Sequence, residues 1–258
     1  MATVITVFSG SGGAGKSLVA CNIACGLTTY GKRVLITEVS FNQRADDIIL
    51  GITPDTVYGF SDICSRNCKP GAAVIRSEDD FHPDFIASVP GDAQDRVKDG
   101  IASLLKSQSG FYDYIIFDLS YSFDDIFDAA VKMSDIAIGV TTDITVSVRN
   151  TAFCMNRARD FGCRKLYTIL NGVCIDNSES SVCVEDIADE LGEALIGIIP
   201  FDEHIKTSVS KSDPIIRYNT YAGRSLENIC KRIMGIPVPE YETGIAAGLF
   251  SKNKLVLK

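Results

Sequence analysis

The chain has 258 residues, of which 46% are hydrophobic and 22% are charged, a composition typical of a globular α/β protein and not of a disordered one. The formal net charge of −8 argues against a broad surface for DNA phosphates, so DNA binding is not expected. The sequence starts with an apolar segment that lacks the layout of a signal peptide, and no stretch approaches the ~18 apolar residues of a spanning helix, so we expect a cytoplasmic protein.

Apolar runs alternate with helical segments along most of the chain. The runs lack polar alternation and predict strands buried on both faces: Val4–Phe8, Val34–Val39, Phe85–Val89, Tyr114–Leu119, Ile136–Thr141, Leu166–Leu170 and Leu195–Ile199. Apolar residues at helical spacing predict helices over Ser17–Tyr30, Ala93–Ser107, Asp124–Met133, Val146–Phe161, Val184–Leu191 and Ala222–Met234. This order predicts a doubly wound, mostly parallel α/β sheet flanked by helices. Pro237 and Pro239 end the predicted domain, residues 1–237, and residues 238–258 form a predicted tail.

The nine cysteines are spread through predicted core segments, which argues against a disulfide framework. The pairs Cys21/Cys25 and Cys64/Cys68 have a spacing that places both sulfurs on one helix face. Because no His or further Cys completes a four-ligand set nearby, we predict that these cysteines are small buried hydrophobic residues.

A glycine-rich loop follows the first predicted strand. The segment Gly10-Ser11-Gly12-Gly13-Ala14-Gly15-Lys16-Ser17 matches the complete phosphate-loop pattern G-x-x-x-x-G-K-[ST] and continues through Leu18 into a predicted helix. Its glycines let backbone N–H groups turn toward phosphates, and the helix N-terminus adds partial positive charge. Lys16 is expected to reach the β- and γ-phosphates, and Ser17 to bind Mg²⁺. We therefore predict that this loop binds ATP with Mg²⁺.

The same loop also fits the dinucleotide pattern G-x-G-x-x-G, and Glu38 lies about where that site would place its ribose-binding acid. This interpretation leaves Lys16 and Ser17 unexplained. The only histidines, His82 and His204, lie in unremarkable contexts, so no substrate base is evident. A dinucleotide-dependent oxidoreductase is therefore the less favoured alternative.

A second acid is predicted beside the loop. Four apolar residues lead into Asp118 at the end of a buried strand, which brings a carboxylate to the carboxyl edge of the sheet. Although strands often end in Asp for turn chemistry, the glycine loop and this strand together favour Asp118 as the second protein contact of Mg²⁺.

The order of these motifs resembles the MinD/ParA family of deviant-Walker ATPases, and more closely MinD than ParA. The resemblance spans nearly the whole chain: Gly31–Ile36 is similar to the family's second strand, Tyr112–Asp118 to its Walker B strand, and Val140–Arg149 to the stretch after strand five. It implies that Asn171 recognises adenine and that the loop containing Pro200 and Asp202 lies against the adenine base. It also implies an ATP-dependent homodimer that positions division or surface machinery and responds to a protein activator.

Three positions depart from the family pattern. Ser11 replaces the signature lysine that crosses to the partner's phosphates, Ser40 replaces the aspartate that orients the attacking water, and Ser122 lies near the position of a switch glycine. Loss of a charge-stabilising donor lowers the rate by about 10²–10³, and loss of a catalytic base by about 10²–10⁴. We therefore predict intact ATP binding through Lys16 but slow hydrolysis, with Glu38 as a weak candidate for the missing carboxylate. A catalytically silent ATP-binding scaffold is the main alternative.

The C-terminal tail differs in charge from the rest of the chain. Residues 244–258 contain no acidic side chain, and their position matches the membrane-targeting helix of MinD. Wound as a helix, Ile245, Leu249 and Phe250 share a sector opposite Lys254 and Lys258, although Gly248 disfavours a helix. Weak peripheral association with the inner face of the cell membrane is one prediction, and a frayed tail or a packed strand is the other.

Overall fold

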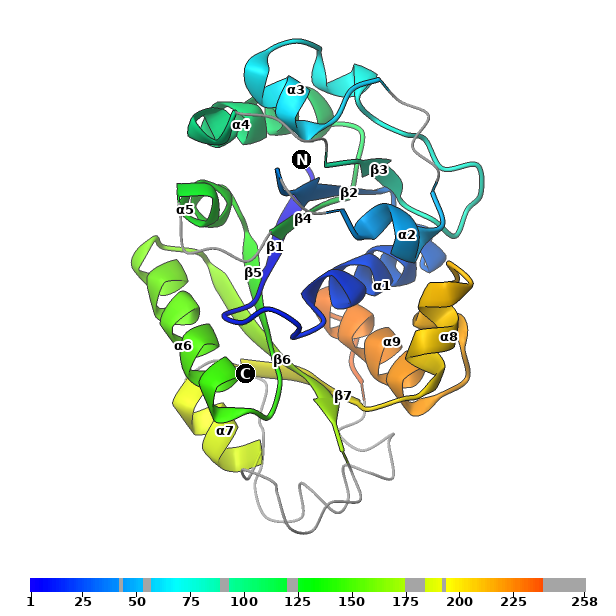
Figure 1. Cartoon of the computed structure of the whole chain (residues 1–258), viewed down its shortest axis with the longest axis vertical. Helices are drawn as coiled ribbons and strands as arrows, with labels where there is room; N and C mark the ends of the chain where they lie inside the picture. The colour runs from blue at the N-terminus through cyan, green and yellow to red at the C-terminus, as the bar shows by residue number, and fades with distance from the viewer. Residues whose placement is uncertain are drawn as a thin grey trace.

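A parallel sheet organises the molecule (Figure 1). The computed structural model describes residues 1–41, 44–52, 57–88, 93–119, 125–174, 184–191 and 194–238. In this part of the chain, seven strands pair in parallel in the order β3-β2-β4-β1-β5-β6-β7. They are β1 (Thr3–Phe8), β2 (Val34–Val39), β3 (Asp84–Ile86), β4 (Tyr114–Leu119), β5 (Ile136–Thr141), β6 (Lys165–Val173) and β7 (Ala194–Pro200). The predicted doubly wound α/β fold is confirmed.

Helices cover both faces of this sheet (Figure 1). One face carries α1 (Lys16–Thr29), α2 (Asp46–Leu50), α8 (His204–Ser210), the 3₁₀ turn η3 (Ile215–Arg217) and α9 (Tyr221–Ile233). The other carries α3 (Phe60–Ser65), α4 (Val97–Gln108), α5 (Asp125–Lys132), α6 (Thr145–Asp160) and α7 (Val184–Leu191). Two further 3₁₀ turns are η1 (Pro70–Ala72) and η2 (Gln94–Arg96).

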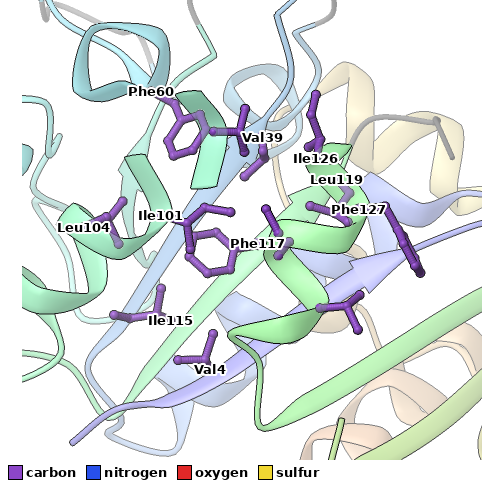
Figure 2. Close-up of a cluster of buried hydrophobic side chains, with 14 of the residues drawn as sticks. Val4, Val39, Phe60, Ile101, Leu104, Ile115, Phe117, Leu119, Ile126 and Phe127 are labelled. Atoms are coloured by element: carbon purple, nitrogen blue, oxygen red, sulfur yellow. The ribbon is translucent and has the colours of Figure 1, made fainter. Parts of the chain in front are cut away.

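Alternate residues along a strand pack into different hydrophobic cores, one on each face of the sheet. In β4, Ile115 and Phe117 pack toward α4 and α5, where Figure 2 shows Phe117 among apolar side chains of these helices. Ile116 lies in the core beneath α1 instead. Because side chains alternate along a strand, Asp118 belongs to the α1 face. Burial of large apolar side chains of this kind stabilises the fold by about 1.5–3 kcal/mol each.

Three details of the predicted elements were wrong. The strand expected over Phe85–Val89 runs over Asp84–Ile86, because it is an edge strand that pairs with β2 at only three positions, and Val89 lies outside the described residues. The helix expected from Ala93 begins at Val97, after the turn η2. The short helices α2, α3 and α8 were not predicted, because five to seven residues are too few to establish a helical period.

The topology places β1 between β4 and β5, so the strand order changes direction beside the first strand. Ligands of such sheets bind outside the carboxyl ends of the strands at this point. The glycine loop between β1 and α1 occupies this location. The position of Ser122 and the predicted tail beyond Val238 lie outside the described residues. Within the described ranges, no helix has the length and apolar character needed to span a bilayer.

Candidate nucleotide-binding site

The glycine loop contains two residues with left-handed backbone. Gly13 and Gly15 adopt φ values of +79° and +81°, a left-handed region that L-residues with a side chain rarely occupy. Gly15 immediately precedes α1, whose first helical residue is Lys16. The loop therefore leads directly into a helix N-terminus, which attracts anions through its unpaired N–H groups and its dipole.

Hydrogen bonds connect the first residues of the glycine loop to α6. The Gly10 N–H donates to Thr151 Oγ1 at 3.2 Å, and a Cβ at Gly10 would lie only 2.2 Å from the backbone of Asn150 and Thr151. Asn150 Nδ2 also lies 3.5 Å from Ser11 Oγ. Gly10 is thus required for the close approach of two backbones. No local sequence pattern predicts this contact, because the two hydrogen bonds join residues 141 and 139 positions apart.

Lys16, Ser17 and Asp118 converge below the loop. Lys16 Nζ lies 2.6 Å from Asp118 Oδ1 and donates to Ser17 Oγ at 3.1 Å. Ser17 Oγ donates to Asp118 Oδ2 at 2.5 Å. Asp118 is only 1% exposed and Lys16 is 12% exposed, so the pair is shielded from water. The three side chains that the sequence assigned to phosphate and metal contacts therefore meet at one point.

Two further acids adjoin Asp118. Glu38 faces Asp118 in the register of β2 and β4, and burial, with the nearby carboxylates, raises its pKa to about 7 despite a hydrogen bond from the Ala45 N–H. Asp46, the first residue of α2, is fully buried, and burial followed by the charges of Asp118 and Glu38 raises its pKa well above the ordinary range. Asp46 is not among the residues that the sequence predicts for this site. Nothing in the local pattern separates it from its neighbour Asp47, which instead pairs with Arg44.

The position of Ser40 lies just beyond this acidic group. Ser40 is 3% exposed, and its carbonyl oxygen accepts a hydrogen bond from Ser88 Oγ. A serine here supplies no carboxylate. Glu38 and Asp46 are therefore the acids of this part of the site that accompany Asp118.

Asn171 on β6 contacts the glycine loop directly. Its Nδ2 donates to the Ala14 carbonyl oxygen at 2.9 Å, and a Cβ at Gly15 would lie 2.2 Å from the same nitrogen. Its Oδ1 is buried and has no hydrogen-bond partner within the described part of the chain. A buried amide oxygen of this kind fits an amino group of a ligand, because an unsatisfied acceptor carries a desolvation cost.

Pro200 and Asp202 lie at the end of the neighbouring strand. Pro200 is the last residue of β7 and is aligned with Val173 of β6. Asp202 Oδ1 accepts from both the backbone N–H and Nδ1 of His204, each at 2.9 Å. These bonds hold the start of α8 beside the end of β7. Leu18, the remaining predicted loop residue, packs against the core beneath α1.

Comparisons with known proteins agree with this fold. A family model described as the CobQ/CobB/MinD/ParA nucleotide binding domain matches residues 5–215. The septum site-determining protein MinD of Helicobacter pylori is 31% identical over an alignment of 265 residues, covering 98% of each chain. The MinC:MinD cell division protein complex of Aquifex aeolicus contains a chain with a TM-score of 0.82 and 25% identity, covering 92% of this chain and 98% of that one. A MinD complexed with Mg-ADP from Pyrococcus horikoshii has a TM-score of 0.81 at 21% identity, with 90% and 96% covered.

Proposed function

Because this chain belongs to the CobQ/CobB/MinD/ParA nucleotide-binding family, as one of its MinD-like members, we propose that it binds ATP together with Mg²⁺. The observation that carries the proposal is the convergence of Lys16, Ser17 and Asp118 at the N-terminus of α1. The Lys16 ammonium is then the phosphate cation, and Ser17 and Asp118 are the protein contacts of the metal. The backbone of Gly10, Ser11, Gly12, Gly13, Ala14 and Gly15 cradles the phosphates.

The ion pair between Lys16 and Asp118 gives the site two arrangements. Without nucleotide, each charge neutralises the other in a shielded place. With nucleotide and Mg²⁺ bound, Lys16 would contact the phosphates and Asp118 would face the metal, so neither charge would be left buried without a counter-charge. At the other end, Asn171 Oδ1, which has no partner among the described residues, would accept from the adenine amino group, and the segment of Pro200 and Asp202 would flank the base.

Hydrolysis is proposed to be slow. Ser11 places no cation over the phosphates, and Ser40 provides no carboxylate for the attacking water. Glu38 is the candidate base, and its pKa of about 7 leaves a substantial fraction protonated at neutral pH. A scaffold that binds ATP without turnover remains the second candidate, favoured by the loss of both the lysine and the aspartate.

We further propose that the protein acts as a nucleotide-dependent dimeric switch that positions division or surface machinery, with a protein activator or client. The support is its full-length similarity to septum site-determining proteins. In this scheme residues 244–258 attach weakly to the inner face of the cell membrane. Two tails in a dimer bind more strongly than one, so ATP-driven dimerisation raises attachment.

Calorimetric titration tests the binding proposal. Wild-type protein is titrated with ATP and, separately, with NAD, both with Mg²⁺, and compared with Lys16→Ala and with the control Lys98→Ala, which changes an exposed lysine on α4. ATP binding should persist in the control and disappear in Lys16→Ala, with unfolding curves to confirm that the variant is folded. Equal ATP affinity in Lys16→Ala and wild type refutes the site. Preference for NAD over ATP supports the oxidoreductase instead.

A further inference from the structure

Phe201 is a large apolar residue exposed at the carboxyl edge of the sheet. It directly follows β7, and 59% of its surface is accessible to water. A single exposed apolar residue on a protein surface needs no explanation by itself. The position of Phe201 relative to the nucleotide-binding loop therefore decides whether it has a role.

The strand register places Phe201 on the same face of the sheet as the glycine loop. Val173 packs into the core beneath α6 and α7, and Pro200 is aligned with it. Ile199 lies in the core beneath α1 and is aligned with Asn171. Because side chains alternate between the faces of a strand, Phe201 shares the face of Ile199 and Asn171.

Hydrogen bonds hold the backbone on both sides of Phe201. Its own N–H donates to the Val173 carbonyl oxygen at 2.9 Å, which continues the pairing of β6 and β7 beyond the last residue of β7. The next residue, Asp202, accepts from the His204 N–H at 2.9 Å through Oδ1 and from the Ile205 N–H at 3.1 Å through its carbonyl oxygen. An aromatic ring on a fixed backbone loses little conformational entropy when a ligand packs against it.

Asn171 adds a buried polar group to this end of the site. It is 8% exposed, its Nδ2 donates to the Ala14 carbonyl oxygen, and its Oδ1 has no partner among the described residues. The next residue, Gly172, has a φ of +75°, and a Cβ there would meet no described atom within 4 Å. An aromatic face and an unsatisfied acceptor at one sheet edge fit a flat heterocycle that carries an amino group.

We propose that Phe201 is the residue on which the base of the bound nucleotide stacks. The inference rests on the proposed function of the glycine loop in binding ATP. Stacking on an aromatic side chain tolerates different bases, and its loss weakens binding about 5–150-fold. Phe201 therefore sets the affinity for the base, whereas Asn171 selects its amino group.

Substitutions at Phe201 and at a matched position test the proposal. Phe201→Ala removes the ring, and Phe201→Tyr keeps it. Phe111→Ala is the control, because Phe111 is 60% exposed and lies before the start of β4, at the opposite edge of the sheet. Each protein is titrated calorimetrically with Mg-ATP and with Mg-tripolyphosphate, which has a phosphate chain but no base. Urea unfolding confirms that each variant is folded.

The expected result is that Phe201→Ala weakens Mg-ATP binding about 5–150-fold but leaves Mg-tripolyphosphate binding within about threefold of wild type. Phe201→Tyr and Phe111→Ala should bind both ligands within about threefold of wild type.

Fluorescence gives a second readout, because the sequence contains no tryptophan. Phe201→Trp and Phe111→Trp each introduce a single indole, whose emission changes when a base stacks on it. Mg-ATP should change the emission of Phe201→Trp, and Mg-tripolyphosphate should not. Phe111→Trp should respond to neither ligand.

Several results would overturn the inference. Wild-type Mg-ATP affinity in Phe201→Ala would refute the stacking role, as would equal losses for the two ligands or Phe201→Trp emission that Mg-ATP leaves unchanged. Wild-type protein that binds Mg-ATP no more tightly than Mg-tripolyphosphate would also refute it, although the phosphate site would stand. Failure of wild-type protein to bind either ligand would refute the proposed function itself, so the two failures are distinguishable.

Discussion

Lys16 should stabilise the nucleotide-free protein as well as bind phosphate. Its ammonium group lies 2.6 Å from Asp118, whose side chain is 1% exposed, and Glu38 and Asp46 add acidic groups to the same place. Removal of one partner of a buried ion pair costs about 3–5 kcal/mol, because the remaining charge has no counter-charge. Lys16→Ala should therefore lose about 3–5 kcal/mol of unfolding free energy, a large part of the 5–15 kcal/mol typical of a domain.

A double-mutant cycle measures this effect. Urea unfolding in EDTA is compared for wild type, Lys16→Ala, Asp118→Asn and the double variant, with Lys98→Ala as an exposed-lysine control expected within about 0.5 kcal/mol of wild type. The double variant should be more stable than the sum of the single losses predicts, with a coupling energy of about 2 kcal/mol. A loss below about 1 kcal/mol in Lys16→Ala, or strictly additive losses, would refute the argument that the pair neutralises a buried charge.

Three further predictions concern pH, turnover and membrane attachment. The fold raises the pKa of Glu38 from 4.5 to about 7 and so favours its protonated form; the metal-free protein should therefore lose stability as pH rises through this window. Urea unfolding at pH 5 and pH 8 measures how far the free energy of unfolding falls between these pH values, and Glu38→Gln should reduce that fall by up to about 3 kcal/mol. An unchanged pH dependence in the variant would contradict the assignment. ATP turnover should be at least about 100-fold below that of an ordinary family member, and Ser11→Lys with Ser40→Asp should raise it; an unchanged rate with intact ATP binding would show that other groups limit hydrolysis. ATP should increase sedimentation with anionic vesicles, and deletion of residues 244–258 should remove that increase but spare ATP binding, so sedimentation that survives the deletion would exclude the tail as the anchor.

The sequence predicted the features that local patterns determine. Apolar runs located the inner strands, and the glycine pattern located the loop between β1 and α1 with Lys16 and Ser17 at its end. The strand of Asp118 was also found, because buried parallel strands lack polar alternation. These features depend on neighbouring residues alone.

Features that depend on tertiary contacts could not be predicted. Burial separates Asp46 from Asp47 only after α2 has packed against α1 and α8, and a helix of five residues shows no periodicity. The contact of Gly10 with Thr151 joins segments 141 residues apart. The bond from Asn171 to the Ala14 carbonyl oxygen, across 157 residues, likewise appears only in the folded chain.

The central claim is that Lys16 exchanges Asp118 for the phosphates of ATP when Mg²⁺ and nucleotide bind. A crystal structure with Mg²⁺ and a non-hydrolysable ATP analogue tests it most directly. We predict that Lys16 Nζ moves from its position 2.6 Å from Asp118 Oδ1 to the phosphate oxygens, and that Ser17 and Asp118 face the metal. Nucleotide bound away from the Gly10–Ser17 loop, or an intact Lys16–Asp118 pair in the complex, would contradict the account.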